Sequence, residues 1–391
     1  MTGRRTISVI AIGAVSALAC GAPALAEEGF LLIDGRLRAH PVRIVEINDR
    51  AVRFLNESDQ VRALARTECI ALAGAGAAPG APGRGAGLLV LADGQRLPGA
   101  MARGSAGASA EILSWEHPWL GRVDVALEQV SALSLRASEP VPVPGDKDVI
   151  VLANGDRLRG FITGLGDPMT IVIDVEAGAR EMQVPVDRAV GLALVTPPRQ
   201  PVGPRIWFAD GTMLDVGRVA AGDDGYLRLD PTWADDADPQ VQVRLADVTA
   251  ILFDPRSMVP LDSIDPIGFE TSAPRFFVPA PLRLDERSPL GLGRIEYRGP
   301  LLVRYALPPG TRRFAAEATV PPDARRWADF ELVVRDDDHE VYRVHLDALA
   351  PEASVNVALA GSELTIELIQ AGNGPIQDWL ILDRAMLLVQ E

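Results

Sequence analysis

Apolar and polar residues alternate along most of the chain, and turn-forming residues interrupt the alternation at short intervals. The clearest stretch is DVIVLANGDRLRGFITGLGD, Asp148 to Asp167, in which two alternating runs flank Asn154 and Gly155. Alternation with a period of two predicts a strand with one buried face, and an Asn-Gly pair between two such runs predicts a β-hairpin with a type I′ turn. We therefore expect antiparallel β-structure built from hairpins.

This hairpin pattern occurs four times. The other copies are GFLLIDGRL (residues 29–37), GLLVLADGQRLPG (87–99) and RIWFADGTML (205–214). The turn glycines, Gly35, Gly94, Gly155 and Gly211, are separated by 59, 61 and 56 residues. A period this regular indicates repeated small domains.

Each copy continues with two more alternating runs, a short polar turn and a last apolar run, for example MTIVIDVEA, REMQVPV, Asp187-Arg188 and AVGLALV. Five short strands bury little as a flat sheet, whereas bending into a small barrel removes the exposed edges. The sequence therefore predicts an all-β chain with four tandem five-stranded barrels, over residues 27–73, 88–136, 148–196 and 205–254. Their linkers are the Gly/Ala-rich segment 74–87, the proline-rich segments 137–147 and 197–204, and a connector at 255–273.

The first half of each repeat resembles the Sm-like small-barrel motif, most closely at Val151, Asn154-Gly155, Leu158 and Gly160. Proteins of that family often bind RNA. Here 38 basic and 53 acidic residues give a formal charge of −15, which repels a phosphate backbone. We predict no nucleic-acid partner.

Residues 1–26 combine Arg4 and Arg5, an apolar run from Ile7 to Leu18 and a small-x-small ending at Ala24 to Ala26. This pattern predicts a secretory signal peptide, and hence an exported protein of the periplasm, the cell surface or the extracellular space. The arginine pair leaves the twin-arginine route open, and Cys20 leaves lipidation open. Beyond this segment no apolar run approaches the length of a transmembrane helix. Only Cys69 remains after cleavage, so no intramolecular disulfide is expected.

From Pro274 the repeat stops, but some eight alternating runs continue to residue 391 and predict a β-sandwich. Three stretches, Val303 to Val320, Phe330 to Arg343 and Val355 to Leu387, resemble the NPCBM family, a carbohydrate-binding module of the galactose-binding-like jelly-roll class. The resemblance implies a jelly roll over residues 274–391 that binds a glycan. The chain departs from the family at Ile376-Gln377, where the family carries an acidic residue and a histidine.

Sugar recognition needs a flat aromatic face together with planar donors and acceptors for the hydroxyl groups. The jelly-roll segment supplies these residue types at six candidate ligand-binding positions, Trp327, Asp329, Arg335, Tyr342, Asp378 and Trp379. A structural interpretation competes with this one: Trp379 could be a core residue that opens the last strand, and Asp378 a turn or capping residue.

Other candidate sites have weaker support. The run Asp336 to Asp338 offers oxygen donors for calcium, but its place between two strands favours a solvated acidic turn. His117 stands between two tryptophans, an aromatic cluster that could form a binding tip. The four histidines lack zinc-ligand spacing, and the chain has neither a nucleophile elbow nor a distinctive carboxylate pair. We predict no metal, no cofactor and no enzymatic activity.

Taken together, these patterns predict an exported, non-catalytic protein in which a barrel array carries a glycan-binding jelly roll. The alternative is a structural or assembly protein of the periplasm or cell surface, whose barrels and jelly roll contact only other envelope proteins. The missing family histidine and the acidic surface favour this alternative.

Overall fold

The computed structural model describes residues 29–74, 87–102, 111–136, 141–143, 145–175, 178–232, 241–271, 279–287, 289–374 and 376–390. Within these ranges the chain forms strands and single 3₁₀ turns without an α-helix, which confirms the all-β class. The same ranges contain no helix long and apolar enough to cross a membrane. The predicted signal peptide, Cys20 and most of the linker 74–87 lie outside the described residues.

The repeated region forms four units of five strands, which we call units 1 to 4. Unit 1 contains β1 (Phe30–Asp34), β2 (Ala39–Ile47), β3 (Ala51–Leu55), β4 (Val61–Ala65) and β5 (Cys69–Gly74). Unit 2 contains β6 (Gly87–Leu91), β7 (Arg96–Met101), β8 (Ile112–His117), β9 (Gly121–Ala126) and β10 (Val130–Ser134). Unit 3 contains β11 (Asp148–Leu152), β12 (Arg157–Gly164), β13 (Met169–Val175), β14 (Gly178–Val184) and β15 (Ala189–Ala193). Unit 4 contains β16 (Arg205–Phe208), β17 (Met213–Ala221), β18 (Tyr226–Pro231), β19 (Val241–Arg244) and β20 (Val248–Leu252).

All four units share one strand order. The first strand pairs with the second and the fifth, the second with the third, and the third with the fourth. Between the fourth and fifth strands a 3₁₀ turn forms where the polar turn was predicted, as at Val186–Arg188, which includes Asp187 and Arg188. The described residues show no ladder between the fourth and fifth strands, so the predicted closure into barrels is not confirmed.

The hairpin turn of unit 3 differs from the type I′ turn predicted from Asn-Gly. In unit 3 the Leu152 N–H donates to the Asp156 carbonyl at 2.8 Å, which closes a loop of three residues. Within that loop only Gly155 has positive φ, at 87°, and the Asn154 side chain accepts the Asp156 N–H at 3.1 Å. The loop therefore follows the longer hairpin class in which a single glycine takes the left-handed position. The loop includes Ala153, so Asn154 and Gly155 are its second and third residues and not the two central residues of a type I′ turn.

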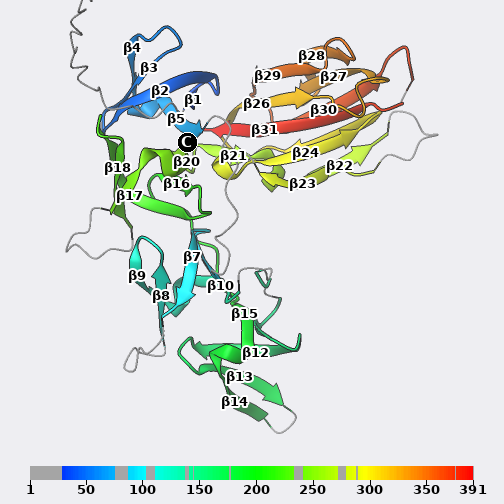
Figure 1. Cartoon of the computed structure of the whole chain (residues 1–391). Helices are drawn as coiled ribbons and strands as arrows, with labels where there is room; N and C mark the ends of the chain where they lie inside the picture. Colours follow the sequence, from blue (N-terminus) through cyan, green and yellow to red (C-terminus); the bar gives the residue numbers. More distant parts are fainter. Residues whose placement is uncertain are drawn as a thin grey trace, which may run out of the picture.

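The units do not pack in chain order (Figure 1). The fifth strands pair antiparallel across units: β5 pairs with β20, joining units 1 and 4, and β10 pairs with β15, joining units 2 and 3. A short pairing of β17 with β7 joins units 4 and 2. The spatial order is therefore unit 1, unit 4, unit 2, unit 3. Units 1 and 4 form one pair, units 2 and 3 form the other, and the contact between units 4 and 2 is the joint that links the two pairs.

The joint between units 2 and 4 is buried and polar. Arg205 donates to both oxygens of Asp215, at 2.6 and 2.9 Å, and to the Asp93 carbonyl at 2.6 Å. Nε2 of His117 lies 2.9 Å from the hydroxyl of Thr212. Burial lowers the pKa of His117 to about 4, so the ring is neutral near neutral pH. The suggestion that His117 forms a binding tip is therefore wrong: the side chain is 3% exposed and belongs to this joint.

The C-terminal region is a sandwich of two antiparallel sheets. One has the order β23-β24-β31-β26-β29, with β21 beside β31, and the other has the order β22-β25-β30-β27-β28. The bounds of these strands are β21 (Met258–Pro260), β22 (Pro266–Glu270), β23 (Leu282–Arg287), β24 (Gly293–Arg298), β25 (Leu301–Ala306), β26 (Thr311–Thr319), β27 (Asp329–Asp336), β28 (His339–Asp347), β29 (Glu352–Ala358), β30 (Glu363–Gln370) and β31 (Trp379–Val389). The sandwich therefore takes two strands, β21 and β22, from the segment predicted as a connector.

One end of the sandwich rests on units 1 and 4 (Figure 1). Apolar side chains of the sandwich, including Leu292, Met386 and Leu388, share a buried cluster with Ile33 and Trp207 of the units. The strand β31 runs from this contact to the opposite end, where Trp379 begins the strand. Eleven residues of extended strand span roughly 35 Å, which leaves that opposite end free.

Candidate functional site

Three segments meet at the free end of the sandwich: the start of β27, the end of β28 and the connection from β30 to β31. They meet because β27 pairs with both β28 and β30. Four of the six predicted ligand-binding residues lie in or beside these segments: Trp327, Asp329, Asp378 and Trp379.

Asp329 organises this end through several hydrogen bonds. One carboxylate oxygen accepts the Asn373 N–H at 2.8 Å, and the other lies 3.1 Å from Nε2 of His345. The Asp329 N–H donates to the Asp378 carboxylate at 3.3 Å, and the Asp329 carbonyl accepts the Ala371 N–H at 2.9 Å. The β30–β31 connection is thus fixed from the strand beneath it.

Asp378 is the most buried polar group at this end, with 1% of its surface exposed. Its Oδ2 atom has no hydrogen-bond partner among the described residues. Burial raises the pKa of this carboxyl to about 6, and the nearby charge of Asp329 adds to the rise, while the hydrogen bond from the Asp329 N–H opposes it. The Asp378 backbone carbonyl accepts the Gly299 N–H at 2.7 Å, so this residue also ties the connection between β24 and β25 to the start of β31.

The two tryptophans differ in how accessible their rings are. Trp379 is partly buried against the sandwich core, and the Arg298 guanidinium covers its ring at 4.4 Å. Trp327 is 48% exposed, with the Arg326 guanidinium 5.0 Å from its ring centre. Trp327 therefore provides the accessible aromatic surface at the free end.

The remaining two predicted residues lie elsewhere. Arg335 is near the far end of β27, on the outer face of the sheet, and donates to Glu367 at 2.9 Å. Tyr342 packs against the core and donates its hydroxyl hydrogen to the Ser354 carbonyl at 3.1 Å. Burial raises the pKa of this phenol. The structure does not bring these two residues to the free end.

The free end also contains polar residues that were not predicted. His345 lies between Asp329 and Asp347, at 3.1 and 3.7 Å, and Asn373 is exposed on the β30–β31 connection. The alternation in residues 329–336 and 339–347, read as one hairpin, was sufficient to place His345 and Asp347 opposite the start of β27. Pairing these two runs in the sequence would have added His345 and Asp347 to the candidate site residues.

The acidic run behaves as a structural turn. Asp336 accepts the backbone N–H groups of Ala360 and Gly361, and Asp337 accepts those of Ser362 and Glu363. These hydrogen bonds lower the pKa of Asp337. The described residues contain no cluster of three or more histidine, cysteine or acidic side chains suited to a metal ion.

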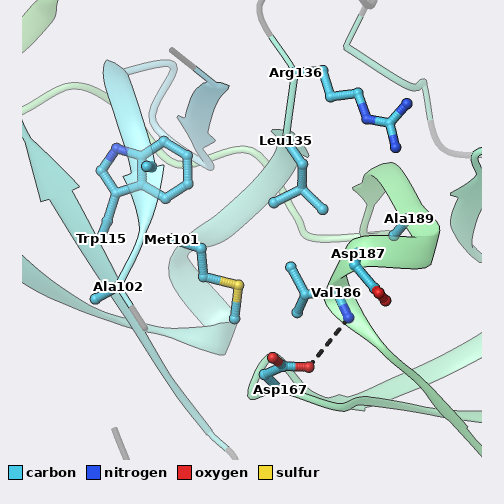
Figure 2. A pocket seen from close by; sticks show the side chains of 10 residues that line it. Met101, Ala102, Trp115, Leu135, Arg136, Asp167, Val186, Asp187 and Ala189 are labelled. Atoms are coloured by element: carbon cyan, nitrogen blue, oxygen red, sulfur yellow. Dashed lines mark hydrogen bonds between the residues drawn. The ribbon is translucent and has the colours of Figure 1, made fainter. Parts of the chain in front are cut away.

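A separate cavity of about 590 Å³ lies between units 2 and 3. Figure 2 shows Met101, Leu135 and Val186 facing its interior, with Trp115 beside them and the polar side chains of Arg136 and Asp187 farther out. Asp167 accepts the Val186 N–H at 3.2 Å, which ties the two loops of unit 3 together. The polar groups do not converge on one point, so the cavity offers no arrangement for proton transfer or nucleophilic attack.

No family model matches the chain, and no curated protein matches it. Among solved structures, CBM51 from Clostridium perfringens GH95 in complex with methyl-galactose is 15% identical; the match covers 33% of this chain and 99% of that one, with a TM-score of 0.28. The tandem CBM51 modules of a family 98 glycoside hydrolase from Streptococcus pneumoniae SP3-BS71 are 11% identical, covering 86% and 88%, with a TM-score of 0.28. An exo-beta-1,3-galactanase from Phanerochaete chrysosporium is 10% identical, covering 92% and 68%, with a TM-score of 0.22. Similarities this low assign no ligand to this chain.

Proposed function

We propose that this protein is a non-catalytic glycan-binding protein whose binding site is the free end of the sandwich. The observation that carries the proposal is the exposed ring of Trp327, which lies two residues before Asp329 at the start of β27. A tryptophan exposed to this extent presents the flat apolar face on which a pyranose ring stacks.

The polar groups nearby would hold the sugar hydroxyls. His345 is about half exposed, at 47%, and its ring is oriented by the carboxylates of Asp329 and Asp347. Asn373 offers an amide donor and acceptor on a connection that Asp329 holds in place. Such preorganised groups bind a ligand with little ordering cost, and no covalent step is involved.

In this account the four units are small barrels that act as a spacer. They hold the sandwich at one end through the cluster around Met386 and leave the other end accessible. The proposal includes export, which rests on the signal pattern in residues 1–26.

The second candidate function is a structural or assembly protein whose domains contact only proteins. One observation favours it: Arg298 covers the Trp379 ring, and the Asp329 carboxylate already accepts a backbone N–H and contacts His345. Side chains that already contact one another have fewer donors and acceptors available for sugar hydroxyls.

The test uses the full chain on a glycan array, followed by calorimetric titration of any glycan that binds. Trp327→Ala is the test variant, and Tyr226→Ala, which removes an aromatic ring 43% exposed on unit 4, is the matched control. We expect Trp327→Ala to weaken binding by roughly tenfold or more, since truncating a central aromatic anchor costs about 2 kcal/mol or more. Absence of binding to any glycan, or equal loss in the control, would favour the protein-contact function.

A further inference from the structure

A groove of about 750 Å³ runs between units 2 and 3 and shares no lining residue with the cavity of Figure 2. Unit 2 contributes the 3₁₀ turn that begins at Leu127. Unit 3 contributes Phe161 and Ile162 of β12 and the segment that follows β15. The groove is therefore a product of the pairing of β10 with β15.

Two large apolar side chains are exposed in this groove. Phe161 is 67% exposed and Val195 is 52% exposed, and both line the groove together with Leu127 and Pro197. Single exposed apolar residues are ordinary on protein surfaces, but several that share one concave surface mark an interaction site.

The groove is held rigidly open by a buried carboxylate. Asp148, 6% exposed, accepts the Ile162 N–H at 2.8 Å and the Val195 N–H at 2.7 Å, one on each oxygen. These are the backbone groups beside Phe161 and at Val195 itself. Two short hydrogen bonds to one carboxyl group fix the backbone at Ile162 and Val195, and with it the directions in which Phe161 and Val195 leave the backbone.

The segment after β15 is also tied to unit 2. The Thr196 hydroxyl donates to the Val130 carbonyl at 2.7 Å, and the Arg199 N–H donates to the Ala92 carbonyl at 2.9 Å. The two walls of the groove are therefore fixed relative to each other before any partner arrives. A preorganised surface retains more of its contact energy on binding.

The rim of the groove is acidic. Glu111 and Glu128 stand on the unit 2 side, and the Glu128 side chain is 77% exposed. The one cation among the lining residues, Arg199, lies 3.4 Å from Glu128, so it neutralises one of these two carboxylates. A partner that presents a positive charge beside an apolar side chain complements this rim, whereas an acidic partner is repelled.

We propose that this groove docks an extended segment of another protein, one that places an aliphatic or aromatic side chain against Phe161 and Val195 and a lysine or arginine at the acidic rim. The site is independent of the glycan-binding proposal, because it lies on units 2 and 3. The chain would then connect two partners, a protein at the groove and a glycan at the sandwich.

The experiment selects binders to the full chain from a display library of random twelve-residue peptides, with counter-selection on the Phe161→Ser variant. Phe161 is largely exposed, so this change is expected to leave the fold intact, which circular dichroism checks. We expect enriched peptides to carry an apolar anchor next to a basic residue, and to bind Phe161→Ser at least tenfold more weakly in fluorescence polarisation. Tyr226→Ser on unit 4 serves as the matched control and should bind as the unaltered chain does.

A second variant separates the charge from the apolar anchor. Glu111→Gln, which removes the rim carboxylate that Arg199 does not neutralise, should weaken basic peptides two- to fivefold and reduce the salt dependence of their binding. Three results would overturn the proposal: no peptide that depends on Phe161, enrichment of acidic peptides, or concentration-dependent dimers in sedimentation that Phe161→Ser abolishes. The last result would identify a second copy of the chain as the occupant.

Discussion

The two unit pairs are built alike but are covered differently. In the pair of units 1 and 4, β5 and β20 meet through Ala73 opposite Ala250, and in the pair of units 2 and 3, β10 and β15 meet through Ala132 opposite Ala193. The outer face of the first seam lies under the sandwich, in a cluster that includes Trp207. The outer face of the second seam has only a small cluster, to which the linker contributes Val141.

This difference shows how one repeat serves two purposes. Burial under the sandwich makes the first pair the base on which that domain is positioned. Among the described residues no domain covers the second pair, which extends away from the sandwich (Figure 1). Its stability depends on the apolar core that it shares with the other units and on the joint with unit 4.

The joint between the pairs should show the largest effect. Removing the carboxylate in Asp215→Ala leaves the Arg205 guanidinium, whose side chain is 14% exposed, without its bidentate partner. Breaking one side of a buried ion pair costs roughly 3–5 kcal/mol. Chemical denaturation measures this loss, and Asp247→Ala, which removes the exposed partner of Arg244, should cost less than about 1 kcal/mol. Equal effects in both variants would mean that the joint contributes no more than a surface contact.

The covered seam comes next. Leu292→Ala empties a fully buried position between the sandwich and units 1 and 4, and should cost roughly 2–5 kcal/mol of unfolding free energy. Hydrogen exchange should show faster exchange in β5 and β20, with little change in β10 and β15. Equal acceleration in both seams would contradict the distinction between the pairs.

Asp378 at the free end of the sandwich should make the free energy of unfolding depend on pH, without a contribution from either unit pair. Because the folded-state pKa of Asp378 is raised to about 6, from an ordinary value of 3.8, its ionised form opposes folding. Stability should therefore rise as pH falls from about 7 towards 4, by at most roughly 3 kcal/mol, and gain nothing further below the ordinary pKa. Asp378→Asn should remove this rise, which denaturation at several pH values would reveal. A rise that persists in the variant would mean that other groups cause it.

The uncovered seam should respond least. Val149→Ala truncates a buried residue of the small cluster and should cost roughly 1–2 kcal/mol, confined to units 2 and 3. Hydrogen exchange of β10 and β15 measures the effect. A cost as large as that of Leu292→Ala would show that the linker covers this seam as effectively as the sandwich covers the other.

The sequence was sufficient to predict the strands and the turns, because both depend on local signals. Alternation identified the strands of unit 3, and Gly155 marked a hairpin turn even though the turn type differed. The order of the units was not predictable. The fifth strands of all four units have similar runs of small and aliphatic residues, such as AVGLA in β15. The local sequence therefore does not determine which two of these strands pair.

The candidate site was predictable where adjacent segments carry it. Asp378 and Trp379 came from one motif, and the pairing of β27 with β30 brings Asp329 to Asp378. Arg335 and Tyr342 are on the same hairpin, but strand periodicity sends Arg335 to the outer face and Tyr342 towards Ser354. His117 was misjudged for another reason: its partner Thr212 is 95 residues away in the chain.

The most direct test of the proposed function uses the six tryptophan indole N–H signals in the NMR spectrum of the full chain. A glycan identified on the array is titrated while these signals are followed, with Trp327→Ala used to assign one of them. If the glycan stacks on Trp327, the Trp327 signal shifts most, the Trp379 signal shifts less because Arg298 covers its ring, and the signals of Trp119 and Trp207 stay fixed. Shifts confined to Trp119 or Trp207 would place the glycan on the units and contradict the account.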